Sequence, residues 1–280
     1  MRKNSPKNKV IVITGGSSGI GYAAADNLLG KGATICLVAN NEEKLRDATE
    51  ILRKKHPDSD LQYYAVDVRN NRDVKDIVRK IVERNMRIDW LLNSAGIAEP
   101  GRFESQPAEA MHRVMDTNYW GAAYFTLEAL PYMKQSSGAA IAFVSSIAGY
   151  VGLFGYSHYV PSKFAVTGLA ECLRMEFNDY NISITVIYPP DTQTPMYERE
   201  QKNTLPECKA LTANAVVLFP EVVAAKLIDG MMNGKFEIYC NVESRLIRLF
   251  RNVTPITFFR FADGIINRSR KKATSVAGSS

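Results

Sequence analysis

The chain has 280 residues, of which 46% are hydrophobic, and a formal net charge of +6 at pH 7. This length and apolar content suffice to bury the core of one large α/β domain, and no apolar run is long enough to span a membrane. From Arg245 onward there are eight Lys or Arg and one Asp, so this segment carries +7 and the preceding 244 residues carry −1. The positive charge therefore belongs to the C-terminal tail, and nothing in the body predicts binding to nucleic acid.

The start of the chain, Met1 to Lys9, is basic and polar and has no apolar stretch of the kind that a secretory signal contains. We therefore expect no signal peptide and a cytoplasmic protein. The cysteines form no Cys-x-x-Cys pair and have no paired histidines, so we expect neither disulfides nor a metal site. They are Cys36, Cys172, Cys208 and Cys240.

Short apolar runs alternate along the body with helical patterns, which is typical of a parallel sheet wrapped by helices. We predict an α/β fold with a Rossmann-type, doubly wound parallel sheet of about seven strands in three α/β/α layers. The expected strands are 10–14, 34–38, 62–65, 90–93, 139–145, 183–188 and 237–239. The expected helices are 20–30, 42–56, 71–85, 107–134, 161–179 and 220–233. Residues 191–219 are the least regular stretch and are predicted to form a lid over a site.

A glycine-rich segment, residues 14–21, follows the first expected strand and opens the first expected helix. In this context backbone amides and a helix N-terminus bind pyrophosphate, so the segment predicts a dinucleotide site. Glycines allow the turn, the close approach of phosphate and close packing of the helix. The cofactor-binding candidates here are Gly15, Ser17, Ser18, Gly19, Ile20 and Gly21.

Cofactor choice is predicted by the end of the second strand. An acidic residue there would hold the adenosine ribose and repel a 2′-phosphate, but the chain has Ala39 followed by Asn40. This favours NADPH and leaves NADH open, because Asn40 stands where an arginine would be expected to bind the phosphate. Asp67, after the third strand, is a candidate acceptor for the adenine amino group; a turn or helix-capping aspartate is the alternative.

Tyr159 and Lys163 are four residues apart, and Ser146 lies thirteen positions before Tyr159. Residues at i and i+4 share one helix face, so the ammonium of Lys163 is expected near the phenol. A phenol has an ordinary pKa of about 10, and a general acid or base works best near the operating pH, so we expect the cation to lower the pKa of Tyr159. Pro161 is compatible with this helix if it lies in the first turn.

Five motifs occur in the order found in the short-chain dehydrogenase/reductases, over roughly residues 8–240. They are the glycine segment, Asn93-Ser94-Ala95-Gly96, Asn118, Ser145-Ser146 and Tyr159-x-x-x-Lys163. The chain resembles that family. The resemblance implies that Tyr159 transfers the proton, Ser146 binds the carbonyl, Lys163 binds the nicotinamide ribose and Asn118 holds a water in a proton relay. It also implies that Asn93 braces the sheet while Ala95 and Gly96 line the cofactor; ordinary structural roles for Ser146, Asn118 and Asn93 are the alternative.

Further segments are similar to the 3-ketodihydrosphingosine reductases, which reduce 3-ketosphinganine with NADPH in sphingolipid synthesis. The most specific is Tyr188-Pro189-Pro190-Asp191-Thr192-x-Thr194-Pro195, because most relatives have Pro-Gly there. The resemblance implies that Pro189, Thr192 and Thr194 bind the cofactor near the nicotinamide; a rigid proline loop capped by hydroxyls is the alternative. Eukaryotic members usually begin with a membrane-spanning helix; the polar start of this sequence predicts none here, which leaves the location of the protein open.

We therefore expect reduction of a long-chain ketone, without a metal. Reduction of another apolar ketone, such as a steroid or a 3-oxoacyl thioester, and a non-catalytic nucleotide-binding scaffold are the alternatives. The sequence predicts Leu153, Phe154, Met196 and Tyr197 as candidates to line the route of an alkyl chain, with ordinary core packing as the alternative. Glu198 or Glu200 is a candidate to meet a substrate ammonium, and the alternative for both is a solvated loop carboxylate.

The expected domains are a catalytic unit over residues 1–242 and a basic amphipathic tail over residues 243–280. The tail mixes cations with aromatic and aliphatic side chains, as interfacial helices do, which predicts peripheral contact with an anionic membrane. Docking of the tail on the body or on a second subunit is the alternative. The family resemblance also implies a homodimer or homotetramer, formed through the helices that carry Asn118 and Tyr159.

Overall fold

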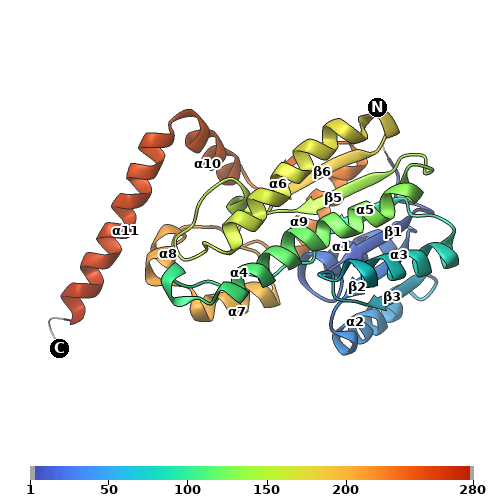
Figure 1. Ribbon diagram of the computed structural model, residues 1–280, viewed down its shortest axis with the longest axis horizontal. Helices are drawn as coiled ribbons and strands as arrows, with labels where there is room; N and C mark the ends of the chain where they lie inside the picture. Colours follow the sequence, from blue (N-terminus) through green and yellow to red (C-terminus); the bar gives the residue numbers. More distant parts are fainter. Residues whose placement is uncertain (1–3, 278–280) are drawn as a thin grey trace.

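The computed structural model describes residues 4–277, with side chains as far as Lys271; the first three residues of the basic start and the last three of the tail lie outside it. Seven strands form one parallel sheet (Figure 1). They are β1 (Val10–Thr14), β2 (Thr34–Ala39), β3 (Leu61–Ala65), β4 (Trp90–Asn93), β5 (Ala140–Val144), β6 (Ser183–Tyr188) and β7 (Glu237–Tyr239). Their order across the sheet is β3-β2-β1-β4-β5-β6-β7, which confirms the predicted doubly wound fold.

Helices cover both faces of the sheet, because strands buried on both sides need an apolar layer above and below. Two hydrophobic clusters fill the space between the layers: α3, α5 and α6 pack on one face, and α1, α2 and α9 pack on the other. The helices of the body are α1 (Gly19–Leu29), α2 (Glu42–Lys55), α3 (Asn71–Asn85), α4 (Ala108–Met115), α5 (Gly121–Met133), α6 (Tyr159–Glu176), α7 (Pro195–Asn203), α8 (Pro206–Leu211) and α9 (Pro220–Met232).

The helix expected over residues 107–134 is interrupted. Between α4 and α5 the backbone forms one wide π turn, Asp116–Trp120, with Asn118 at its centre. Wide turns of this kind occur mostly at functional sites, since they add a residue without ending the helix. The other expected helix of interest, α6, begins at Tyr159, so Pro161 does lie in its first turn.

The stretch 191–219 is less irregular than expected, because it contains α7 and α8. Each begins with a proline, which is favoured at the first helical position, where no backbone donor is needed. Thr194 caps α7 by accepting a hydrogen bond from the amide of Tyr197 at 3.2 Å. The sequence pattern hid these helices because both are short and polar.

The C-terminal segment forms α10 (Val242–Val253) and α11 (Pro255–Ala277). The hydroxyl of Tyr150 donates to the carbonyl of Ser244 at 2.8 Å, and Arg248 forms an ion pair with Glu237 at 2.7 Å, so α10 is attached to the body. α11 packs against α8 and extends away from the sheet (Figure 1). Within the described part of the chain, no helix combines the length and the apolar character needed to cross a bilayer.

The chain reverses its direction of winding between β1 and β4, which are neighbours in the sheet. In such sheets ligands bind beside this reversal, at the carboxyl ends of the strands. The ends of β1 and β4 are joined there by Thr14, whose hydroxyl accepts hydrogen bonds from the amides of Ser94 and Ala95, each at 3.1 Å. This edge of the sheet is where the predicted site residues converge.

Candidate active site

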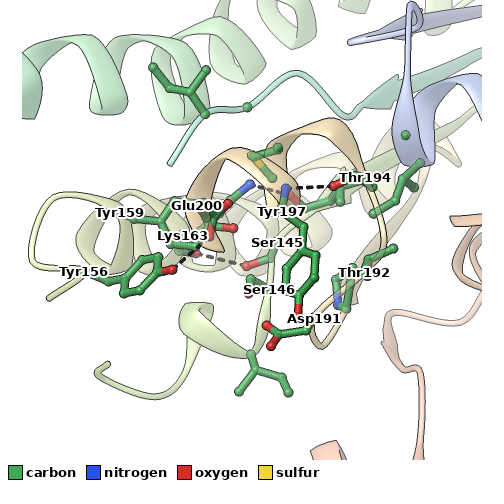
Figure 2. Close-up of a pocket in the computed structure, with 18 of the residues that line it drawn as sticks. Ser145, Ser146, Tyr156, Tyr159, Lys163, Asp191, Thr192, Thr194, Tyr197 and Glu200 are labelled. Carbon is green, nitrogen blue, oxygen red and sulfur yellow. Dashed lines mark hydrogen bonds between the residues drawn. The ribbon is translucent and has the colours of Figure 1, made fainter. Parts of the chain in front are cut away.

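A cavity of about 780 Å³ opens along the carboxyl edge of the sheet. Its walls come from the segments that follow β1, β2, β3, β4, β5 and β6, together with α6, α7 and the two C-terminal helices. Ligand cavities of a few hundred to about 1,000 Å³ are usual for cofactor and substrate sites. Figure 2 shows part of this cavity, where side chains from the loop after β5, from α6 and from α7 point toward one another.

The glycine segment forms the first wall of the cavity, and its geometry explains two of its glycines. Gly15 has a φ of +68°, and a side chain there would come within 2.8 Å of the amide of Ala95. A side chain at Gly21 would lie 2.5 Å from the carbonyl of Gly15, so α1 could not pack against the loop. Ser18 leaves the first amides of α1 without a side-chain cap, and these amides face the cavity. The segment therefore fits a pyrophosphate.

The end of the cavity near β2 and β3 contains both polar residues that the sequence singled out. Asn40 lines the cavity and is exposed. Asp67 also lines it, but its carboxylate is paired with Arg69 at 2.5 Å, and this hydrogen bonding holds the pKa of Asp67 below its ordinary value. Lys44, on the first turn of α2, lines the same end and was missed in the sequence. The sequence could have indicated Lys44, because it follows Ala39, the last residue of β2, by only five residues and so lies near the same end of the cavity.

The proline segment after β6 forms the wall opposite the glycine segment. Pro189, Thr192 and Thr194 all line the cavity. Both threonine hydroxyls also have local roles, because Thr192 donates to the carbonyl of Pro190 at 2.8 Å and Thr194 caps α7. The segment is therefore both a proline loop capped by hydroxyls and a wall of the cavity.

Three of the four predicted catalytic residues meet in the cavity: Ser146 at the end of β5, and Tyr159 and Lys163 on α6 (Figure 2). Tyr159 and Lys163 are buried. The Lys163 ammonium lies 5.6 Å from the centre of the Tyr159 ring and donates to the carbonyl of Val144 at 2.9 Å. The i and i+4 spacing therefore places the two side chains together, as predicted.

The expectation that Lys163 lowers the pKa of Tyr159 is wrong for this geometry. Burial raises the pKa of the Tyr159 hydroxyl above its ordinary value, and the carboxylate of Glu200 raises it further, against a hydrogen bond with Ser146 that lowers it. Burial also lowers the pKa of Lys163 to about 8. The reason is that α6 buries both groups while the ammonium is directed to the Val144 carbonyl. Tyr159 is therefore a neutral phenol at neutral pH.

Asn118, the fourth predicted catalytic residue, does not line the cavity. The amide nitrogen donates to the carbonyl of Ile97 at 3.0 Å and to the Ser162 hydroxyl at 2.8 Å, and the amide oxygen accepts from the amide of Ile97 at 2.8 Å. Both ends of the side chain thus have partners within the protein. Asn118 instead fixes the loop after β4 against α6.

Of the remaining predicted cofactor residues, some line the cavity and others do not. Asn93 is buried on β4 and donates to the Thr126 hydroxyl at 3.2 Å, which ties the sheet to α5. It does not line the cavity, and neither does Gly21. The other predicted residues do line it; these are Gly15, Ser17, Ser18, Gly19, Ile20, Ala95 and Gly96.

Glu200 is the polar residue of the cavity that the sequence left undecided. It lies on α7, and its carboxylate accepts a hydrogen bond from the Tyr156 hydroxyl at 3.0 Å (Figure 2). Glu198 is exposed and does not line the cavity. Helical spacing was the available signal: in a helix that begins at Pro195, Glu200 lies on the same face as Tyr197, three residues before it, and Glu198 does not.

Apolar side chains line the rest of the cavity. Leu153, Met196 and Tyr197 do so as predicted, whereas Phe154 does not, because its ring lies under the guanidinium groups of Arg102 and Arg270. The C-terminal helices add a wall that the sequence analysis had placed outside the catalytic unit. Its apolar members, called here the tail wall, are Ile247, Phe258, Phe261 and Ile265.

The chain is similar to known proteins over most of its length. Residues 9–205 match the model of the short chain dehydrogenase family. The chain belongs to this family. It is 38% identical over 274 residues to a 3-ketodihydrosphingosine reductase of Dictyostelium discoideum, covering 92% of this chain and 82% of that protein. It is also 40% identical over 230 residues to a 3-dehydrosphinganine reductase of Danio rerio, covering 81% of this chain and 69% of the relative. This short-chain dehydrogenase is thus an oxidoreductase.

Solved structures show the same fold. A short chain dehydrogenase/reductase from Burkholderia phymatum, in complex with NAD, has a TM-score of 0.81 at 22% identity, covering 89% of this chain and 94% of that one. A levodione reductase has a TM-score of 0.78 at 27% identity, and the match covers 85% of this chain and 98% of the levodione reductase. These levels of structural agreement confirm the seven-stranded, Rossmann-like short-chain dehydrogenase fold.

Proposed function

We propose that this short-chain dehydrogenase reduces 3-ketosphinganine to sphinganine in sphingolipid synthesis. The observation that carries the proposal is one cavity in which Ser146, Tyr159 and Lys163 lie beside an apolar wall built by the C-terminal helices. The tail wall suits an alkyl chain, because burying each CH₂ group contributes about 0.8 kcal/mol. The relatives from Dictyostelium discoideum and Danio rerio, whose names state this activity, support the same substrate.

The side chains suggest how the reduction proceeds. Ser146 and Tyr159 hold the ketone oxygen by hydrogen bonds, and Tyr159 gives its proton to that oxygen as the carbonyl is reduced. A bound nicotinamide supplies the hydride. The raised pKa of Tyr159 fits this direction of reaction, because the hydroxyl keeps its proton until negative charge develops on the substrate oxygen. Lys163 adds a positive charge beside this centre, and Asn118 positions the loop that faces it.

NADPH is the proposed cofactor. No carboxylate stands at the end of β2, where Ala39 and Asn40 line the cavity, so a 2′-phosphate would meet no repulsion from these two residues. Lys44 lines the same end of the cavity, and no ion pair of its side chain is found in the part of the chain that the structure describes. A lysine at this place can bind a phosphate as a point charge.

The substrate proposal is tested by NADPH oxidation with 3-ketosphinganine, a steroid ketone and an acetoacetyl thioester at equal concentrations. We expect the largest kcat/KM for 3-ketosphinganine. A higher value for the steroid or the thioester would assign the cavity to another apolar ketone. Oxidation with none of the three would contradict the proposal.

We also propose that the protein is cytoplasmic and attaches to an anionic membrane surface through α10. One face of this helix exposes four apolar side chains at helical spacing, called here the tail stripe: Val242, Leu246, Leu249 and Val253. Residues 242–280, which include the stripe, have eight Lys or Arg against Glu243 and Asp263, a charge of +6 that complements anionic lipid. A soluble surface seldom exposes such a continuous apolar strip, whereas interfacial helices do.

Liposome flotation tests the attachment. The double variant Leu246→Ser with Leu249→Ser changes two exposed side chains that do not line the cavity, so it removes apolar surface without opening the site. We expect wild type to float with anionic vesicles and the variant to stay in solution with its turnover unchanged. Equal flotation of both proteins would contradict attachment through this face, and a change of oligomeric state in the variant would assign the stripe to a second subunit.

A homodimer or homotetramer formed through α5 and α6 is proposed as well. These helices expose Leu127, Phe164 and Met175, which are large apolar side chains. Light scattering of the purified protein gives the mass, and Leu127→Glu should reduce it to that of one chain. A wild-type mass equal to one chain would contradict the proposal.

A further inference from the structure

Glu200 lines the same cavity as the proposed proton donor, Tyr159. Its carboxylate is on the face of α7 that lines the cavity, beside Tyr156, Tyr159 and Lys163 (Figure 2). One carboxylate oxygen accepts from the Tyr156 hydroxyl at 3.0 Å, and the rings of Tyr156 and Tyr159 are packed edge to face with centres 6.0 Å apart. The Tyr156 ring therefore lies between Glu200 and Tyr159, the proposed proton donor, and contacts both.

No cation is paired with this carboxylate. Among the described residues, no Lys, Arg or His nitrogen lies within ion-pair distance of Glu200. Lys163 is nearby, but its ammonium is bonded to the carbonyl of Val144. Burial raises the pKa of Glu200 to about 7, and the neighbouring Asp191 raises it as well, while the hydrogen bond from Tyr156 and the more distant charges of Lys163 and Arg199 lower it. A desolvated carboxylate without a cation costs free energy, and proteins keep such groups mostly where a ligand completes them.

A lone carboxylate here would also oppose reduction of a neutral ketone. Negative charge develops on the substrate oxygen and on Tyr159 as the proton moves, and the charge of Glu200 disfavours it. A positive group on the substrate would remove this penalty. The position of Glu200 is thus a disadvantage for a neutral ketone and an advantage for a ketone with an ammonium beside the carbonyl.

We propose that Glu200 binds the ammonium of the substrate and selects ketones that carry a protonated amine on the carbon next to the carbonyl. The inference rests on the proposed function, since 3-ketosphinganine has its amine at this position. Glu200 determines specificity in this scheme, and Tyr156 positions its carboxylate. The tail wall would bind the alkyl chain at the other end of the same molecule.

The test compares two ketones that differ only in the amine: 3-ketosphinganine and 1-hydroxyoctadecan-3-one. Glu200→Gln keeps the shape and an acceptor for Tyr156 but removes the charge. We expect kcat/KM for the amino ketone to fall about 30-fold in this variant, and kcat/KM for the deamino ketone to stay equal or rise. Glu198→Gln, a change of the same kind on the exposed side of α7, should alter neither value.

Equal losses for both ketones would show a merely structural role and overturn the inference, as would no loss for either. In these two cases wild type still reduces 3-ketosphinganine, so the proposed function stands. Preference of wild type for the deamino ketone would overturn both. If Glu200→Gln fails to fold, product inhibition of wild type decides: sphinganine should inhibit at least about tenfold more strongly than octadecane-1,3-diol, and equal inhibition would overturn the inference.

Discussion

Two carboxylates at opposite edges of the sheet, Asp89 buried and Glu200 partly buried, have very different surroundings. Asp89 precedes β4 at the amino edge and is fully buried, yet it accepts hydrogen bonds from the Val10 amide at 2.8 Å, from Arg87 and from Ser136. Burial alone would raise the pKa of Asp89, but these partners outweigh burial and hold it below the ordinary value. Glu200, at the carboxyl edge, has only the Tyr156 hydroxyl as a hydrogen-bond partner within the described residues, and its pKa is raised.

The different partners of Asp89 and Glu200 indicate that the first carboxylate contributes to stability and the second to function. A buried carboxylate surrounded by donors and cations stabilises the fold, and removing it leaves those donors unsatisfied. A buried carboxylate without a cation destabilises the fold slightly and becomes useful only when a ligand arrives. The amino edge of the sheet therefore holds the chain together, and the carboxyl edge keeps unsatisfied groups for substrate and cofactor.

The largest expected effect is on catalysis at the carboxyl edge. Tyr159→Phe removes the proton donor, so kcat should fall by at least about 1,000-fold, which corresponds to about 4 kcal/mol. The stability of the fold and the affinity for NADPH should stay close to wild type, because the ring remains in place. NADPH fluorescence titration and urea unfolding check the two controls. A variant with substantial turnover would contradict the assignment of Tyr159.

The next effect is on stability at the amino edge. Asp89→Asn should lower the free energy of unfolding by about 3 kcal/mol, since Arg87 and Lys9 lose their partner. Turnover per folded molecule should not change. Because the folded pKa of Asp89 is depressed, its stabilisation is present above about pH 4 and is lost as the pH falls through the folded value. Urea unfolding measures this, and the two proteins should converge in stability in strong acid.

A smaller effect concerns the pH dependence of amine selection. Glu200 is ionised above its pKa of about 7 and protonated below it, so its attraction for an ammonium weakens as the pH falls. The ratio of kcat/KM for the amino ketone to that for the deamino ketone should fall up to about tenfold per pH unit below about pH 7. The charged and titratable groups that interact with Glu200 are Tyr156, Tyr159, Lys163, Asp191, Tyr197, Arg199 and Cys208.

The ratio isolates Glu200 from these neighbours. Lys163, with a pKa of about 8, titrates for both ketones and therefore cancels. In Glu200→Gln the ratio should not change with pH. A ratio that still falls in this variant would assign the titration to Asp191 or another neighbour and not to Glu200.

The smallest effect concerns the cofactor end of the cavity. Lys44→Ala should raise KM for NADPH about fivefold, or about 1 kcal/mol, and leave KM for NADH unchanged. Lys54→Ala is the matched control, since Lys54 lies on the same helix but does not line the cavity. Equal effects on both cofactors would contradict a role of Lys44 at the 2′-phosphate.

The sequence predicted the elements of the fold closely because their signals are local. The strand at 10–14, the glycine segment after it and the helix that follows are adjacent in the chain, so backbone geometry alone relates them. The spacing of Tyr159 and Lys163 likewise sets both on one helix face. The short polar helices α7 and α8 were missed because neither has an apolar period that a sequence pattern could show.

Other features needed contacts between distant segments. Asn118 bonds to Ser162, and Tyr156 bonds to Glu200, each across 44 residues of sequence. No spacing in the chain could predict that the first pair would close the Asn118 side chain to the cavity. The same holds for the tail wall, because only the packing of α11 against α8 brings Phe261 to the cavity.

The sequence by itself determined the doubly wound sheet, the glycine turn and the set Ser146, Tyr159 and Lys163. The sheet and the turn follow from apolar periodicity and short spacings along the chain. The set of three residues was predicted from the i and i+4 spacing of Tyr159 and Lys163 together with the family resemblance, which implies the role of Ser146. Only the tertiary structure decided the pKa direction of Tyr159, which of Glu198 and Glu200 meets the cavity, and the place of the C-terminal helices. The physical reason is that the burial and the electrostatic surroundings of a residue depend on segments that are far apart in the chain and meet only in the folded molecule.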